Sequence, residues 1–389
     1  YIILQLNPPV THMKTKYILI SILVIMTALL IGFLYKINTI SDQAIVDTNK
    51  DKTVSYVSLE DKIKHSQPFT LLLLGYAGGK HDGKYLTDSI MVAKIRPRDE
   101  EIDLISVPRD LWVKIPLNDE ESINKKINEV FYIGMDDKRY SNKKVEFTGR
   151  AGGGELAKKV IGEVLGFKID YFASIDFDGF IKIIDNLGGI KIKVSKTFDD
   201  PKYPIEANIN DTCGKTDEEV TVLTATMSGE KLEDQFPCRY ENLHFDRGWQ
   251  HMDGTTALKF ARSRHSPTDG GDFNRAERQK LVANAVKDRV INIGFISKIV
   301  PTVKILSRHI MTDIDFTTMN ELVIRLPQLS EYKIISLTLT DKNVLTHGVA
   351  TTGQFILQPK LGENNWEEVH KFIENKGIAT SSAIIEGQN

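Results

Sequence analysis

The chain has 389 residues, of which 41% are hydrophobic and 26% are charged, so it can form at most two or three globular domains with buried cores. Its formal net charge is −2, because 50 lysines and arginines nearly balance 52 acidic residues. A protein that binds nucleic acid usually carries a basic surplus on its binding domain. The overall charge therefore gives no support for DNA or RNA as a partner.

Residues 17–35 form an apolar run without a charged side chain. At about 1.5 Å per residue, a helix of this length spans about 28 Å, close to the hydrocarbon thickness of a bilayer. A cleaved signal peptide is the alternative, but its apolar region is usually about 7–15 residues long, and no small-residue cleavage site follows Tyr35. Tyr17 and Tyr35 would lie at the two membrane interfaces. We therefore predict one uncleaved transmembrane helix.

The residues around this run predict the topology. Met13-Lys14-Thr15-Lys16 is basic, which favours a cytoplasmic start and an extracytoplasmic location for everything after Lys36. The predicted segments, in chain order, are an upstream read-through over 1–12, the cytoplasmic start and membrane anchor over 13–36, a polar stalk over 37–66, an extracytoplasmic domain over 67–377 and a loose tail over 378–389.

Apolar runs and amphipathic stretches alternate through this domain. The runs predict strands over 69–75, 89–95 and 101–107, and alternating residues predict a half-exposed strand over 189–194. Helical patterns cover 154–165, 177–187, 253–261 (capped by Asp253) and 274–292, and a strand with a turn (337–360) and a short helix (366–373) follow. The alternation predicts an α/β fold, a three-layer α/β/α sandwich with a mixed central sheet.

Both cysteines, Cys213 and Cys238, lie in a polar stretch over 197–247 that has little periodicity. In an exported chain we expect them to form a disulfide, which stabilises by about 3 kcal/mol if its effect is the chain entropy of the closed loop. The alternative is two free thiols in a flexible insert.

Arginines gather between residues 260 and 279. Arg262 and Arg264 are two residues apart, so they project from one face of an extended chain. Arg275 and Gln279 share a stripe on the following helix, with Arg278 beside them. The stripe continues into core positions, so the helix buries the face on which its first arginine lies.

Several guanidiniums near a helix N-terminus predict a site for a multiply charged oxyanion, above all a phosphate or pyrophosphate. The alternative is a structural network in which Glu277 or Asp272 pairs with the arginines. A second candidate group lies at strand ends, where Asp88 precedes one strand and Arg109 follows another. The alternative for Asp88 is a turn residue that starts the strand, and the alternative for Arg109 is a surface ion pair with Asp110.

Several segments match those of one known family in order and spacing. They begin with Leu86-Thr-Asp-Ser-Ile-Met-Val, Ile105-Ser-Val-Pro-Arg-Asp, Lys126-Ile-Asn, Ile169-Asp-Tyr-Phe, Ile175-Asp-Phe-Asp-Gly-Phe, Leu187-Gly-Gly-Ile and His251-Met-Asp-Gly. The most specific are Phe260-Ala-Arg-Ser-Arg-His and Gly271-Asp-Phe-Asn-Arg-Ala-Glu-Arg-Gln. Over about 69–290 the chain thus resembles the LytR–CpsA–Psr family of cell-wall glycopolymer phosphotransferases.

The resemblance implies an enzyme that transfers a glycopolymer from a polyprenyl pyrophosphate carrier to peptidoglycan through a phosphodiester bond, with Mg²⁺. It fits a membrane-bound protein, and the anchor and the lack of a basic surplus argue against a nucleic-acid partner. The residues expected to bind pyrophosphate are Arg109, Lys126, Arg262, Arg264, Arg275, Arg278 and Gln279. Those expected to be catalytic are Asp88, Arg109, Asp272 and Arg275, and those expected to hold the metal are Asp88 and Asp82.

The chain departs from the family pattern in two places. The family often has Leu-Leu-Gly-x-Asp after the first strand, whereas this chain has Ala77 at the aspartate position. Either Asp82 replaces that aspartate from a longer glycine-rich loop, or one metal ligand is missing. The polar insert over 197–247 is interpreted as a surface excursion, with acceptor choice or a partner contact as the alternative. A pyrophosphate hydrolase and a non-catalytic wall-polymer receptor are the rival functions.

Overall fold

The computed structural model describes residues 59–79, 83–227, 229–292, 309–314 and 332–376. Its central sheet has six strands in the order β11-β6-β1-β2-β3-β12. β6 is parallel to β1 and β12 is parallel to β3, while the other neighbours are antiparallel. The sheet is therefore mixed, as predicted. Its strands are β1 (Phe69–Tyr76), β2 (Thr87–Arg96), β3 (Glu101–Ser106), β6 (Tyr171–Asp176), β11 (Ile310–Thr312) and β12 (Lys333–Thr338).

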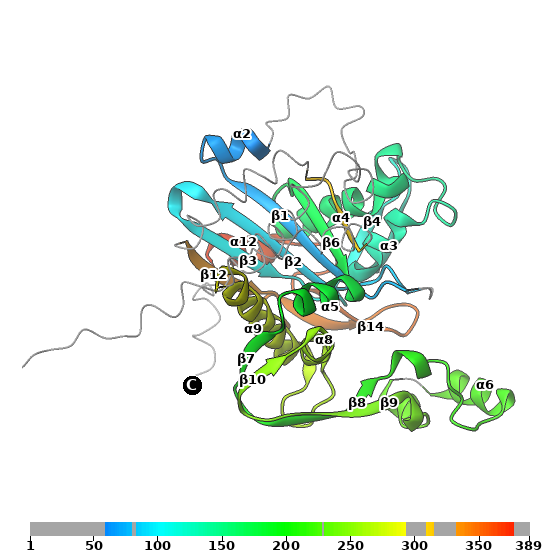
Figure 1. Cartoon of the computed structure of the whole chain (residues 1–389). Coiled ribbons are helices and arrows are strands. Elements are labelled where there is room, and N and C mark those ends of the chain that lie inside the picture. Colours follow the sequence, from blue (N-terminus) through cyan, green and yellow to red (C-terminus); the bar gives the residue numbers. More distant parts are fainter. Residues whose placement is uncertain (1–58, 80–82, 228, 293–308, 315–331, 377–389) are drawn as a thin grey trace, which may run out of the picture.

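Side chains alternate across this sheet, so each face has its own core. Leu71 and Leu73 of β1 belong to one hydrophobic cluster, whereas Leu72 and Leu74 belong to the other. Helices cover both faces (Figure 1), which confirms the three layers. The first cluster includes residues of α5 (Phe177–Asn186), α8 (Gly254–Arg262) and α9 (Gly271–Asn292), and the second includes residues of α3 (Val130–Met135), α4 (Gly149–Leu165) and α12 (Glu367–Glu374).

Helix α4 begins five residues before its predicted start, because its first turns contain a run of glycines that carry no helical pattern. Packing requires those glycines: a Cβ on Gly154 would lie 2.2 Å from the ring of Phe172, and one on Gly152 would lie 2.4 Å from the carbonyl oxygen of Phe147. The helix ends as predicted, at Gly166, whose φ of 80° is left-handed.

Smaller elements surround the sheet. Three two-stranded pairs are β4 with β5, β7 with β10, and β13 with β14. The segment predicted as a strand and a turn thus contains part of β12 and a complete hairpin. The bounds are β4 (Trp112–Pro116), β5 (Ser122–Lys126), β7 (Ile190–Val194), β10 (Gly248–Met252), β13 (Leu345–Val349), β14 (Phe355–Pro359) and α2 (Leu59–Lys64), with short 3-10 turns at Pro97–Asp99, Ile127–Glu129, Val145–Phe147, Glu206–Asn208 and Pro237–Arg239.

The polar stretch over 197–247 is folded, and we call it the insert arm. It contains β8 (Phe198–Pro204), α6 (Asp217–Thr226), α7 (Glu230–Glu233) and β9 (Tyr240–Phe245), and β8 pairs antiparallel with β9. Figure 1 shows the arm extending from the sheet layers with α6 at its far end. Cys213 and Cys238 form the predicted disulfide, with their Cα atoms 5.6 Å apart.

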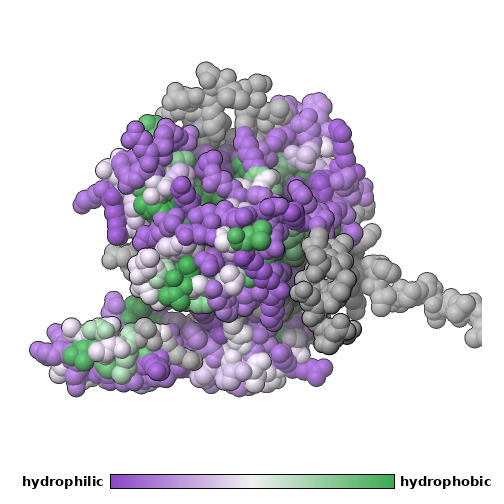
Figure 2. Space-filling view, turned by 180° about the vertical axis from the view of Figure 1, so that it is seen from behind, coloured by the Kyte–Doolittle hydropathy of each residue, from purple (hydrophilic) through white to green (hydrophobic). Residues whose placement is uncertain are grey.

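The interpretation of the insert arm as a surface excursion holds for its outer part (Figure 1) but not for its base. Phe198 and Phe245 are buried, stack with a centroid distance of 5.3 Å, and join the first core. The outer part of the arm is exposed, and Figure 2 shows a hydrophobic patch on it at lower left in a mostly hydrophilic surface. The arm thus joins the core at its base and meets solvent at its tip.

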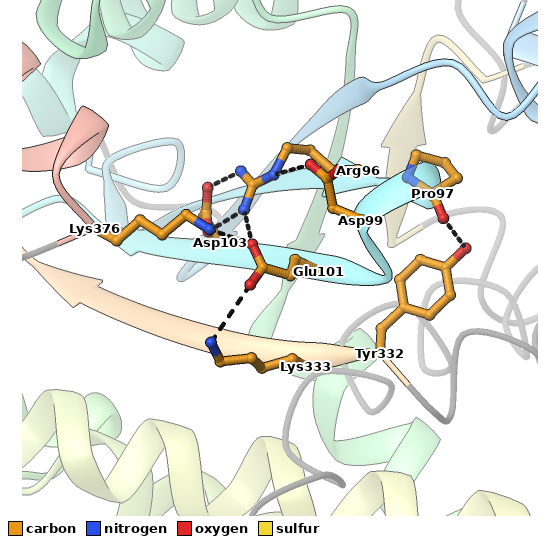
Figure 3. Close-up of polar contacts among 8 residues, drawn as sticks. All are labelled: Arg96, Pro97, Asp99, Glu101, Asp103, Tyr332, Lys333 and Lys376. Carbon is orange, nitrogen blue, oxygen red and sulfur yellow. Dashed lines mark hydrogen bonds and ion pairs between the residues drawn. The ribbon is translucent and has the colours of Figure 1, made fainter.

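At one end of the β2–β3 hairpin lies a dense group of ion pairs (Figure 3). Arg96 contacts Asp99, Glu101 and Asp103, and Lys376 contacts Glu101. These contacts hold the C-terminal end of the described chain against the sheet.

Two predicted segments meet the limits of the described residues. The anchor over 17–35 lies outside them, and no helix within them is long and apolar enough to cross a membrane. The end of the predicted stalk is described: α2 buries Ile63 in the first core, and Lys62 Nζ lies 2.7 Å from Asp170 Oδ1.

Candidate active site

A cavity of about 500 Å³ lies between the central sheet, α5, α8, α9 and the insert arm. From the sheet, β1, β2 and β6 contribute lining residues on the same face as the first core. Much of the lining is apolar, including Leu73, Met91, Ala173, Ile175, Phe180, Ile183, Ile184, Leu258, Ala261, Val282 and Val286. The cavity is therefore a gap in the first core that remains open to the polar residues described next.

Six of the predicted site residues line this cavity, although they come from separate elements. They are Asp88 at the start of β2, Arg109 after β3, Arg262 at the end of α8, Arg264 just beyond it, and Arg275 and Gln279 on the first turns of α9. The stripe predicted for α9 continues along the cavity, because buried Val282 and Val286 line it too. The fold thus brings four of the predicted arginines to a largely apolar cavity, whose lining also includes the acidic residues Asp176, Asp200 and Glu233.

The pair of Arg109 and Asp88 joins two strand ends. Arg109 Nη1 donates to Asp88 Oδ1 at 2.5 Å, and Arg109 Nε lies 3.5 Å from Asp110 Oδ2. Lys126 Nζ is 2.6 Å from Asp110 Oδ1 and is not part of the cavity lining. Although burial raises it, the hydrogen bond from Lys126 and the charge of Arg109 hold the pKa of Asp110 below its ordinary value. Lys126 was predicted to bind pyrophosphate. It instead contacts Asp110, which in turn lies beside Arg109.

Arg262 is held by aromatic rings and by the insert arm. Its Cζ lies 4.3 Å from the ring centroid of Phe177, a cation–π distance. Its Nη1 lies 3.2 Å from Tyr203 Oη and 3.3 Å from Glu206 Oε1. The arm therefore positions one of the predicted anion-binding arginines.

The insert arm also fixes the loop that carries Arg264. Asp200 of β8 is fully buried and accepts hydrogen bonds from Ser263 Oγ at 2.7 Å and from the backbone N–H groups of Arg264 at 2.8 Å and His265 at 3.1 Å. Burial raises the pKa of Asp200, but these hydrogen bonds outweigh it and hold that pKa below its ordinary value. A charged Asp200 thus orders the segment between Arg262 and His265.

Arg278 does not join the other arginines. Its guanidinium is buried, donates to Asp269 Oδ2 at 2.9 Å and to the Asp269 carbonyl at 2.9 Å, and also contacts the Ser263 carbonyl. It is absent from the cavity lining. The assignment of Arg278 as a pyrophosphate contact is therefore corrected to a structural one, in which Asp269 is the acidic partner.

Two predicted residues cannot be placed. Asp82 lies outside the described residues. Asp272 is the second residue of α9, but its side chain is outside the described part of the structure. The role of either carboxylate therefore stays a prediction.

The described residues offer limited ligands for a metal. One group brings three potential ligands close together, namely Asp211, Cys213 and Cys238, and the disulfide removes both sulfurs as thiolate ligands. In the cavity, Asp88 supplies a carboxylate beside the arginines. Mg²⁺ is typically held by one or two carboxylates together with substrate phosphates, so the chemistry of Asp88 fits such an ion.

Several cavity residues were missed by the sequence analysis. Asp176 caps α5, where it accepts from the Gly179 N–H at 2.8 Å and lies 2.9 Å from His309 Nδ1. The insert arm contributes Glu233, Arg239 and Tyr240. The position of Arg239 and Tyr240 directly after Cys238 was the available signal, since a disulfide fixes the residues beside it.

A sequence profile of the LytR_cpsA_psr family matches residues 31–369 of the chain. Polyisoprenyl-teichoic acid–peptidoglycan teichoic acid transferase TagV of Bacillus subtilis is 26% identical over 254 residues, which cover 64% of this chain and 51% of TagV. The corresponding transferase TagU of Enterococcus faecalis is 24% identical over 286 residues, covering 72% and 74%. Regulatory protein MsrR of Staphylococcus aureus is 25% identical over 294 residues, covering 75% and 70%.

The match to TagV thus spans about half the length of that relative. The crystal structure of B. subtilis TagV is similar to this fold, with a TM-score of 0.51 and 25% identity, over 81% of this chain and 99% of the crystallised one. The mixed α/β architecture is therefore shared with a solved relative.

Proposed function

The chain belongs to the LytR_cpsA_psr family, and from this membership and its cavity we propose that it is a membrane-anchored phosphotransferase acting in cell-wall assembly. It moves a glycopolymer from a polyprenyl pyrophosphate carrier to peptidoglycan and forms a phosphodiester bond. The observation that carries the proposal is the combination, in one cavity, of a long apolar lining with four predicted anion-binding arginines. The transferase names of TagV and TagU support it.

The apolar lining suits the hydrocarbon part of such a donor. A polyprenyl chain has no hydrogen-bonding group, so it is bound by burial of apolar surface. Side chains from the sheet and from α5, α8 and α9 supply that surface, among them Leu73, Ile183 and Val282. The lipid carrier is therefore assigned to the space between the sheet and these helices.

The arginines suit the pyrophosphate. Arg109, Arg262, Arg264 and Arg275 come from three separate segments of the chain, and guanidiniums bind phosphate oxygens through paired hydrogen bonds. Arg275 is 9% exposed, so its interaction with an anion would be screened little by water. Gln279, one turn further along α9, adds an amide that can donate to the same group.

We propose the following reaction at this site. The hydroxyl oxygen of the acceptor forms a bond to the phosphorus that carries the sugar, and the bond from that phosphorus to the bridging oxygen breaks. Polyprenyl phosphate leaves with the bridging oxygen, and Asp272 is proposed to take the proton of the hydroxyl. The arginines stabilise the charge that develops on the phosphate oxygens.

Asp88 would hold Mg²⁺, with Asp82 proposed as a second ligand, and the ion would supply further charge neutralisation at the phosphates. The proposed location of the domain outside the cell agrees with the disulfide of the insert arm, because disulfides persist in oxidising compartments. The transmembrane helix over 17–35 would hold the cavity near a lipid-linked donor.

The test uses the full chain in lipid nanodiscs with a synthetic polyprenyl pyrophosphate glycan, peptidoglycan fragments and Mg²⁺. We expect a phosphodiester-linked product, and a fall of about 100- to 1,000-fold in its rate in Arg275→Ala, as for loss of one oxyanion donor. Arg98→Ala, which removes an exposed arginine, is the matched control and keeps the wild-type rate. Release of sugar phosphate without attachment would indicate a hydrolase, and binding without turnover would indicate a receptor.

A further inference from the structure

The insert arm builds one wall of the cavity. The arm residues that line the cavity, besides Asp200, are Tyr203, Pro204, Ile209, Glu233, Arg239 and Tyr240. They adjoin the arginine group directly, because Tyr203 Oη lies 3.2 Å from Arg262 Nη1. A ligand group attached to a pyrophosphate held by Arg262 would therefore meet this wall first.

The disulfide and three hydrogen bonds fix this wall. Cys238 precedes Arg239 in the chain, and its carbonyl accepts from Asn208 Nδ2 at 2.9 Å. The Arg239 carbonyl accepts from the Ile205 N–H at 2.8 Å. Arg239 Nε donates to the Asp211 carbonyl at 2.6 Å. Two turns that are distant in the sequence are thus tied together at the cavity.

Arg239 is pre-oriented by a buried ring. Its Cζ lies 3.8 Å from the ring centroid of Phe236, and Phe236 is 1% exposed. Stacking and the bond through Nε fix the plane of the guanidinium before any ligand binds. A side chain held in this way loses little conformational freedom on binding, which favours affinity and selectivity.

The chemistry of the wall differs from that of the arginine group. Glu233 adds a carboxylate that would repel a phosphate, and Tyr240 adds a half-exposed aromatic ring with a hydroxyl. Arg239 and Glu233 together offer donors and acceptors, and the ring offers a flat apolar face. Polar groups that ring an aromatic surface suit a sugar, which has hydroxyls at its edge and C–H groups on its faces.

We propose that Glu233, Arg239 and Tyr240 form a sugar subsite that binds the first glycosyl residue of the donor and makes the insert arm a selector of the donor glycan. This inference rests on the proposed function, because the donor pyrophosphate must lie against Arg262. The subsite is built by the arm, so its specificity depends on the Cys213–Cys238 disulfide.

The test measures binding of two probes to the full chain in nanodiscs: polyprenyl pyrophosphate without a sugar, and the same lipid carrying a hexose or an N-acetylhexosamine. The wild-type chain binds at least one sugar-bearing lipid about tenfold more tightly than the bare lipid. Arg239→Gln and Glu233→Gln remove that difference and leave bare-lipid binding unchanged. Arg247→Gln, an exposed arginine of the same arm, keeps it.

The outcomes separate this inference from the proposed function. Failure of the wild-type chain to bind bare polyprenyl pyrophosphate would overturn the proposed function, and this inference with it. A wild-type chain that binds bare and sugar-bearing lipids equally, or an Arg239→Gln variant that weakens both equally, would overturn the sugar subsite alone. The Arg239→Gln variant could instead lose binding of peptidoglycan fragments and keep the preference for sugar-bearing lipid. That result would overturn the assignment of the subsite to the donor sugar.

The disulfide gives an independent readout. Replacing both cysteines by serine frees the two turns, so we expect the sugar preference to fall to about twofold or less while bare-lipid binding persists. Circular dichroism and thermal unfolding of this variant show that the rest of the domain is folded. A double variant that is folded and keeps the full sugar preference would contradict the role given to the disulfide.

Discussion

Arginine meets carboxylate at both ends of the β2–β3 hairpin, but only one of the two ends lines the cavity. At the end drawn in Figure 3, Arg96 Nη2 lies 2.8 Å from Glu101 Oε2 and 2.9 Å from Asp103 Oδ1, and Lys333 and Lys376 also contact Glu101. Hydrogen bonds from Lys376 and Arg96 lower the pKa of Glu101 to about 2. Here carboxylates and cations satisfy one another within the chain.

At the other end, Arg109 pairs with Asp88, but both line a cavity that they share with further arginines. Asp200, the most buried carboxylate there, is engaged by Ser263 and by backbone N–H groups. Identical residue types thus make a structural network at one end and a candidate anion site at the other. The difference is the cavity, where a bound anion could contact the arginines in addition to their partners within the chain.

The largest expected effect on stability comes from Arg278, an arginine near the cavity that is compensated like Arg96. Replacing it by alanine leaves the Asp269 carboxylate and the Ser263 carbonyl without a buried donor, so the free energy of unfolding should fall by about 3 kcal/mol. This loss is at the low end of the values for breaking a buried ion pair, because Asp269 keeps a second cationic partner, Lys196 Nζ at 2.8 Å. Urea unfolding measures the loss.

Lys280→Ala on the same helix is the control for Arg278→Ala, and it should change the free energy of unfolding by less than about 0.5 kcal/mol. Under conditions where the protein is folded, Arg278→Ala should retain sugar-free lipid binding. If it instead lost lipid binding and kept its stability, Arg278 would belong to the anion site after all.

The next effect concerns Asp88. Asp88→Asn should lower the transfer rate about 100-fold and weaken its dependence on Mg²⁺, because it removes the charge of the proposed metal ligand. The side chains of Arg109 and Asp88 are 24% and 33% exposed, so breaking the pair should cost less than about 1 kcal/mol of stability. Magnesium titrations of the transfer rate test the assignment, and an unchanged titration curve would remove Asp88 from the metal site.

Sequence patterns predicted the layers and most of the candidate site, because both depend on local signals. Apolar runs marked β1, β2 and β3, and the spacing of Arg275 and Gln279 placed both on one stripe of α9. Arg278 is three residues from Arg275 but lies outside the cavity lining, because it pairs with Asp269. Asp269 reaches Arg278 only when the loop between α8 and α9 folds. Helical spacing does not carry that information.

The buried base of the insert arm and its cavity residues were not predicted, for a related physical reason. Its cavity residues, such as Arg239 and Tyr240, lie in turns without periodicity, and long-range contacts fix them: the disulfide, and the hydrogen bonds that join the segment around Ile205 to the one around Cys238. The burial of Phe198 and Phe245 at the base of the arm likewise depends on strand pairing across more than forty residues. Such pairing is not visible in a polar sequence.

The smallest effect tests the compensated end of the hairpin. Glu101→Gln removes the charge that Arg96, Lys333 and Lys376 share, and should lower the free energy of unfolding at pH 7 by about 1 kcal/mol. The pKa of Glu101 is about 2 in the folded chain and about 4.3 when unfolded, so the unfolded state binds more protons between these values. Its stabilisation is complete above pH 4.3 and is lost as the pH falls through about 2. The difference between wild type and Glu101→Gln should therefore shrink over this window, whereas Glu100→Gln, which alters an exposed neighbour, should track the wild type throughout. A difference that stayed constant down to pH 2 would show that the charge of Glu101 contributes nothing to the stability of this end of the hairpin.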